Sequence, residues 1–127
     1  MDNSRLENLI KEKTRLLVLH QPGQHTDLHL ELRNTGFLLA DAMPCPDSPQ
    51  DFDWKKDYDQ LVFDNIDENT LLTFVNERDS RMYFAYTSGR YQSLPPNKVA
   101  IANSKMTLYS RLMESLTWQY WQTGKAA

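Results

Sequence analysis

Six short apolar segments, separated by turn-forming residues, constrain the fold of this chain most strongly. They cover residues 14–20, 25–33, 36–43, 58–66, 70–78 and 81–88. Each has the length and the composition of a β-strand, and breaks such as PGQ, NTG and DEN carry turn chemistry. Strands joined by such short turns favour antiparallel neighbours. The sequence therefore predicts an antiparallel sheet of about five to six strands.

An amphipathic helix is predicted at each end of this sheet. Ser4 and Glu7 form a capping-box pattern ahead of apolar residues at helical spacing. Near the other end, Asn103 or Ser104 can cap a long helix with the sequence KMTLYSRLMESLTWQYWQ. Residues 48–57 are either one or two helical turns or a loop. The expected fold class is α+β, with the sheet flanked by an N-terminal helix and a long C-terminal helix.

Size and charge limit the classes of function that the chain can have. A length of 127 residues suits a single domain spanning 1–127. The net charge of −3, without any basic run, argues against nucleic acid as a partner. No apolar stretch approaches the roughly 20 residues that span a bilayer, and the start of the chain is polar, so we expect an acidic cytoplasmic protein that does not enter a membrane. The single Cys45 has no partner for a disulfide in the chain.

The segment HTDLHLELR raises the question of a metal site. In a strand, its leucines would share the buried face, and His25, Asp27 and His29 would share the other. The spacing His25-x-Asp27 resembles two ligands of an iron site with two histidines and one carboxylate. That site needs a further histidine from a distant strand, and none follows His29. We therefore expect a solvated polar face and no metal, and we keep a small metal-dependent enzyme as the third functional hypothesis.

Other patterns of catalytic or ligand-binding residues are weak. Four aspartates lie between Asp51 and Asp59, but this segment lacks the glycine and the final glutamate of a calcium loop. No nucleophile, Walker or dinucleotide motif is present, and four glycines leave little material for phosphate-binding loops. The sequence therefore predicts no catalytic residue, no cofactor and no enzymatic activity.

The C-terminal helix carries the strongest indication of function. Its predicted core stripe consists of Met106, Tyr109, Leu112, Met113, Leu116 and Tyr120. Trp118 falls nearly opposite the centre of this stripe, and Trp121 falls at its border. Tryptophan is enriched at interface hot spots, so we predict a partner-binding surface with Trp118, Trp121, Tyr91 and Trp54. The alternative is that Trp118 packs against the sheet edge or the N-terminal helix of its own chain.

Part of the sequence resembles a known family. The segment RMYFAYTS, followed by SLPPN and MTLYSRLMESLTW, is similar to the pattern of a strand, a leucine-proline turn and a leucine-rich helix in class I chaperones of type III secretion systems. The similarity is closest over residues 81–121 and otherwise concerns the architecture. It implies a cytosolic homodimer that holds part of a secreted effector on the apolar patches of its sheets, without catalysis.

The leading functional hypothesis is therefore a non-enzymatic protein-binding module, such as a chaperone for a secreted effector. The alternative is an immunity or inhibitor protein whose acidic face, including Asp51 to Asp59, covers the basic active site of a toxin. Both hypotheses predict a protein partner, and the first also predicts a homodimer.

Overall fold

The computed structural model describes residues 4–52, 58–77, 83–87, 91 and 99–122. Along the described chain the elements are α1 (Ser4–Lys13), β1 (Arg15–His20), α2 (Leu28–Asn34), β2 (Leu39–Pro44), the 3-10 turn η1 (Pro49–Asp51), β3 (Gln60–Asp64), α3 (Glu68–Glu77), β4 (Tyr83–Tyr86), β5 (Val99–Ala102) and α4 (Lys105–Gln122). The predicted N-terminal and long C-terminal helices are confirmed as α1 and α4. The 3-10 turn η1 begins at Pro49, so a helical turn forms at the start of the range 48–57; residues 53–57 of that range lie outside the described residues.

The five strands form one sheet in the order β2-β1-β3-β4-β5, and every neighbouring pair is parallel. The number of strands agrees with the prediction, but the antiparallel arrangement was wrong. Parallel neighbours need a crossover between them, which is usually a helix. Two of the six segments predicted to be strands are instead the helices α2 and α3. Each of these helices is a crossover between two neighbouring parallel strands, so the predicted antiparallel order does not form.

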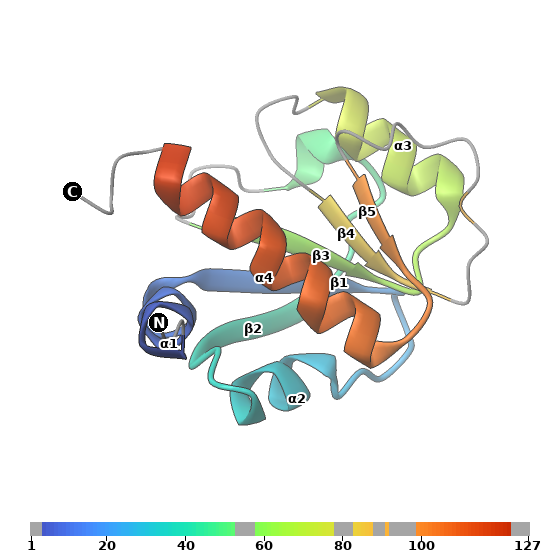
Figure 1. The fold of residues 1–127 in the computed structure, drawn as a ribbon. Helices are drawn as coiled ribbons and strands as arrows, with labels where there is room; N and C mark the ends of the chain where they lie inside the picture. The colour runs from blue at the N-terminus through green and yellow to red at the C-terminus, as the bar shows by residue number, and fades with distance from the viewer. Residues whose placement is uncertain (1–3, 53–57, 78–82, 88–90, 92–98, 123–127) are drawn as a thin grey trace.

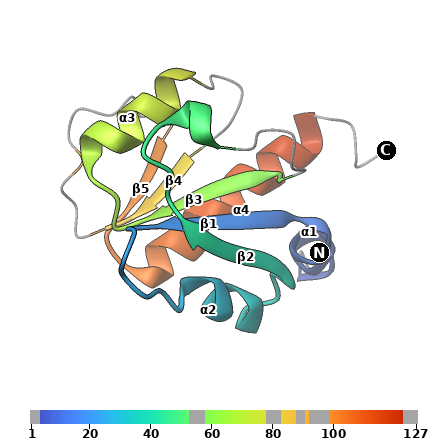
Figure 2. The same ribbon diagram turned by 180° about the vertical axis from the view of Figure 1, so that it is seen from behind.

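Helices cover both faces of the sheet (Figures 1 and 2). One buried cluster joins α1, α2 and α4 to one face, and a second cluster joins α3 and the η1 region to the other. The central strands are buried on both sides, since Leu16 to Leu19 are at most 2% exposed and Leu61 to Phe63 are fully buried. Continuous apolar strands of this kind are typical of parallel sheets between two helical layers.

The segment HTDLHLELR is a loop followed by α2 rather than a strand. Leu28 and Leu32 are buried one helical turn apart, whereas Leu30 is 45% exposed. The NTG sequence ends the helix: Gly36 has a φ of 111°, and the amide of Phe37 donates to the Leu32 carbonyl at 3.0 Å. This is the Schellman pattern, in which glycine adopts a left-handed conformation after the last turn. The predicted hairpin turn is therefore a helix cap.

The segment TLLTFVNER forms most of α3, so its prediction as a strand was also wrong. Asp67 accepts hydrogen bonds from the amide and the hydroxyl of Thr70 at 2.9 and 2.7 Å, which is the arrangement of a helix N-cap. Leu71, Phe74 and Val75 then face the core at helical spacing. The sequence analysis also missed β5, which follows the paired prolines and completes the sheet beside β4.

Candidate functional site

The outer side of α4 is the most distinctive exposed surface of the described chain. Leu108, Leu112 and Leu116 face the sheet and are at most 4% exposed. Trp118 and Trp121 remain 61% and 59% exposed. The two indoles that the sequence analysis proposed for binding are thus accessible on the last turns of the helix.

The predicted core stripe of α4 was displaced around the helix. Met106 was expected in the core and is 80% exposed, while Leu108 was not in the predicted stripe and is fully buried. Tyr109, Met113 and Tyr120 are only partly buried against the core. Apolar residues occur at helical spacing on two adjacent sides of α4, so spacing alone does not show which side is buried. The side that contains Leu108 is the one that contacts the sheet.

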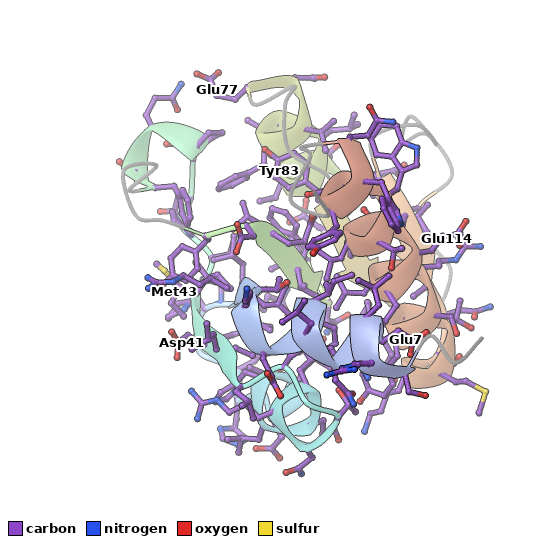
Figure 3. All side chains as sticks on the ribbon, turned by 60° about the vertical axis from the view of Figure 1, so that its left-hand side comes forward. Glu7, Asp41, Met43, Glu77, Tyr83 and Glu114 are labelled. Carbon is purple, nitrogen blue, oxygen red and sulfur yellow. The ribbon has the colours of Figure 1, made fainter. Side chains whose placement is uncertain are left out.

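A shallow hollow lies on this outer side, between α4 and α1. Its volume is about 550 Å³. It is lined by Glu7, Tyr109, Ser110, Met113, Glu114 and Thr117. Figure 3 labels Glu7 on α1 and Glu114 on α4, the two helices that form its walls. We call this hollow together with Met106, Trp118 and Trp121 the α4 surface.

A second hollow, of about 330 Å³, lies where the end of α1 meets the end of α4. Leu9, Ile10, Lys13, Thr14, Asp59, Leu116, Gln119 and Tyr120 line it. Two of its polar side chains have partners within the fold: Gln119 donates to the buried Gln60 at 3.1 Å, and Asp59 accepts from the Arg15 backbone amide at 2.9 Å. The first bond joins α4 to β3, and the second joins the start of β1 to the residue that precedes β3, so both side chains have a structural role.

The orientation of the indole of Trp121 is supported by its neighbour. The rings of Tyr120 and Trp121 are 6.0 Å apart and nearly perpendicular, at 84°. An edge-to-face contact of this kind stabilises an aromatic pair beyond the area that it buries. This contact restricts the orientations that the exposed ring of Trp121 can adopt.

The other two residues predicted to bind a partner do not join the α4 surface. Tyr91 is 7% exposed and packs in the cluster on the α3 side of the sheet. Burial raises the pKa of its hydroxyl to about 12, and a hydrogen bond with Thr87 opposes this shift. Trp54 lies outside the described residues. The sheet separates Tyr91 from the two tryptophans of α4.

The three histidines of the chain lie in different parts of the fold. His20 ends β1, and His29 lies on α2. His25 contacts Asp27 at 2.7 Å, with side chains that are 84% and 63% exposed. Among the residues that the structure describes, no group of three or more His, Cys, Asp or Glu side chains could hold a metal ion.

The sheet topology marks a second region where a ligand could be expected. In doubly wound parallel sheets, ligands bind beyond the carboxyl ends of the strands where the strand order reverses, which here is between β1 and β3. Three of the described residues in this region form hydrogen bonds within the fold. Thr26 donates to Asp64 at 2.5 Å, Asp67 caps α3, and the backbone amide of Asn65, which has a φ of 56°, donates to the Tyr86 carbonyl at 3.1 Å.

Cys45, which follows β2, is not an activated nucleophile. It is 5% exposed. Burial raises the pKa of its thiol from 9.0 to about 12, with further contributions from Asp67 and Asp47. Because the thiolate is the reactive form, this environment suppresses nucleophilic chemistry.

We expect Cys45 to react very slowly with a thiol reagent at pH 8 in the native protein. The shift of the pKa from 9.0 to about 12 lowers the thiolate fraction by about 1000-fold. The rate of reaction with a chromogenic disulfide would measure this, and the same protein in guanidinium provides the control. The chain has one cysteine, so the signal reports a single site. A native rate close to the denatured rate would contradict the buried position.

A further group of exposed apolar side chains lies beside the edge strand β2. Leu38 and Leu39 are 59% and 41% exposed. The edge is partly blocked, since Arg33 donates to the Ala40 carbonyl at 2.7 Å and pairs with Asp41 at 2.9 Å. Charged side chains at a sheet edge discourage the addition of another strand. The α4 surface is therefore the better candidate for binding.

The sequence analysis identified the tryptophans but missed the hollow beside them. Glu7 and Ser110, which line it, carry no signal of function in the sequence. They become neighbours only because α1 packs against α4.

No helix among the described residues has the length and apolar character needed to cross a membrane. Comparison of the chain with family models, with curated proteins and with solved structures finds no match.

Proposed function

We propose that this chain is a protein-binding module that uses the α4 surface. The observation that carries the proposal is the pair of tryptophans, Trp118 and Trp121, each about 60% exposed within one turn of a helix whose other side is fixed in the core. Large exposed apolar side chains grouped together are typical of interaction sites. Tryptophan is also enriched among the residues that dominate binding energy.

Groups elsewhere in the described fold give no comparable support for a catalytic site. Thr26 and Asp67, in the loops that precede α2 and α3, are engaged in hydrogen bonds within the fold. The thiol of Cys45 is held in its unreactive form. A buried free thiol also suits a reducing compartment, so we place the function in the cytoplasm.

A secreted effector and a toxin are the two partner classes that the sequence suggested, and both remain compatible with an α4 surface. The mode of binding has to differ from the one that the chaperone resemblance implies. Helices cover both faces of the sheet, so a partner segment cannot lie across it. Contact through α4 instead resembles helix recognition, in which aromatic and aliphatic anchors at helical spacing fill a partner's groove.

A photo-crosslinking experiment in the native host tests this function. A photoreactive phenylalanine analogue replaces Ser110 in the hollow, and the same analogue at Leu38, near β2, is the matched exposed control. We expect a crosslinked protein from position 110, absent from position 38, which mass spectrometry then identifies. If neither position yields a crosslinked protein, the α4 surface is not a binding site.

Removal of an indole should weaken this binding without destabilising the fold. We expect Trp118→Ala to weaken capture of the crosslinked protein by about 2 kcal/mol or more, the hot-spot range. Its melting midpoint should stay close to that of the parent because the side chain is 61% exposed. Calorimetric binding and thermal denaturation on the same preparation would measure both. Unchanged affinity, or loss of the folded state, would contradict the assignment of Trp118 to an interface.

A further inference from the structure

We propose that the α4 surface binds a basic segment of another protein, with an arginine side chain of that segment placed between the carboxylates of Glu7 and Glu114. This inference rests on the proposed function and deepens it, because it names the chemistry of the partner that occupies the same surface. It follows from the charge, the apolar walls and the aromatic rings that this surface brings together.

The hollow in the α4 surface carries negative charge that the fold does not neutralise. Its charged lining residues are Glu7 of α1 and Glu114 of α4. In the part of the chain that the structure describes, neither carboxylate forms an ion pair, whereas Glu31 on α2 pairs with Lys105. A cation from a partner would complete the charge pairing that the fold leaves open.

Each of these carboxylates has one cation a helical turn away on its own helix, and neither cation is paired with it. Lys11, four residues after Glu7, instead donates to the Thr35 carbonyl at 3.0 Å. Arg111, three residues before Glu114, does not line the hollow and forms no ion pair with the described residues. The negative charge of the hollow is therefore available to a partner.

The exposed tryptophans lie on the same side of α4 as Glu114. Trp118 and Trp121 follow Glu114 by four and seven residues, a spacing that places the three side chains on one side of a helix. A cation over the face of an indole is attracted by the ring, and arginine makes this contact more often than lysine. The planar guanidinium group can also bind a carboxylate through two parallel hydrogen bonds. A carboxylate beside two exposed indoles therefore favours arginine.

The walls of the hollow suit the rest of an arginine side chain. Tyr109 and Met113 provide apolar surface, and Ser110 and Thr117 provide hydroxyl groups. The methylene stem of arginine packs on apolar surface while its charged end stays with polar groups. The hydroxyl oxygens can accept the N–H donors of the guanidinium that the carboxylates leave unused.

The same charge disfavours other occupants of the α4 surface. An acidic segment, a nucleic acid or an anionic lipid surface would bring like charge against Glu7 and Glu114, which weakens binding. A second copy of the chain would bring these same two carboxylates against this face. The net charge of −3 also attracts a basic partner at longer range and speeds its encounter with the chain.

The test uses the protein that crosslinking at position 110 identifies. We expect its crosslinked peptide to contain arginine and to carry a net positive charge. In calorimetric binding to that protein, Glu114→Gln should weaken the affinity by about 30-fold, as for the loss of one partner of an enclosed ion pair, and Glu7→Gln should also weaken it. Glu77→Gln is the matched control, because it removes one exposed carboxylate from α3, on the other face of the sheet (Figure 3).

Salt dependence gives a second measurement on the same proteins. Raising NaCl from about 0.05 M to about 0.5 M should weaken binding of the parent more than binding of Glu114→Gln, because salt screens the charge pair that the variant lacks. Thermal denaturation checks that each variant is folded. Equal affinities of Glu114→Gln and the parent, equal losses from Glu114→Gln and Glu77→Gln, or a crosslinked peptide without arginine would overturn the proposal.

The two proposals can fail separately. Crosslinking of position 110 to a neutral or acidic segment, or to a second copy of this chain, would contradict the basic partner and leave the protein-binding function intact. A chain without crosslinks at position 110 would contradict both.

Discussion

Phe63→Ala should lower the free energy of unfolding by about 3–5 kcal/mol, the range for a buried phenylalanine. Phe63 lies on β3, the middle strand of the sheet, and is fully buried. Its ring is 5.4 Å from that of Phe74 on α3 and 5.4 Å from that of Tyr83 on β4. Truncation leaves a cavity between the sheet and α3 that these rings cannot fill without leaving their own contacts. Urea titration, analysed as a two-state transition, would measure the loss.

Trp118→Ala is the matched control, because it removes a larger ring from an exposed position. Its effect on the free energy of unfolding should stay within about 0.5 kcal/mol, as for other surface substitutions. Since small domains are stable by only about 5–15 kcal/mol, Phe63→Ala can leave part of the sample unfolded in water. Phe63→Leu, which retains most of the apolar volume, would then give a measurable intermediate loss. Equal effects of Phe63→Ala and Trp118→Ala would contradict the packing of α3 on the sheet.

Leu32→Ala and Leu30→Ala should differ strongly, and this pair tests whether residues 28–34 form a helix. Leu32 is fully buried between α2 and the sheet, whereas Leu30 is 45% exposed. We expect Leu32→Ala to cost about 2–5 kcal/mol as a core truncation, and Leu30→Ala to cost well under half as much, because little of its contact is lost. The two variants remove the same atoms, so the comparison cancels the chemistry of the substitution.

A strand would give a different result for the same pair. Residues 30 and 32 would then share one face, and both truncations would be costly. Equal losses in urea titrations would therefore support the strand predicted from alternation and contradict α2. The strand hypothesis implied a core position for Leu30, which its exposure in the structure corrects.

Some of the parallel topology could have been read from the sequence. The runs at Leu16–Leu19 and Leu61–Phe63 are continuously apolar rather than alternating, which is the pattern of strands buried on both faces. Asp67 three residues before Thr70 is a possible N-cap, and Gly36 is a possible C-cap. These signals were interpreted as turns between strands, because Asp, Asn and Gly serve both purposes.

Other features depended on which elements came together. In the segment 25–33, apolar residues at every second position include pairs four apart, so Leu28 and Leu32 fit a helix as well as a strand. In the folded chain, Leu28 and Leu32 are buried against the sheet and Leu30 is exposed, which is the arrangement that a helix gives. In the same way, contact with the sheet buried Leu108 of α4 and left Met106 in water.

The sequence by itself determined the terminal helices and the apolar segments that became four of the five strands, because each depends on local spacing, whereas it left open whether Trp118 is exposed or packs on its own chain. Only the tertiary structure decided the parallel strand order, the conversion of two predicted strands into crossover helices, and the hollow beside Trp121. The hollow requires Glu7 of α1 to lie against Ser110 of α4, about a hundred residues away in the chain. Contacts at that separation arise when the sheet forms and buries one side of each helix, and local spacing does not encode them.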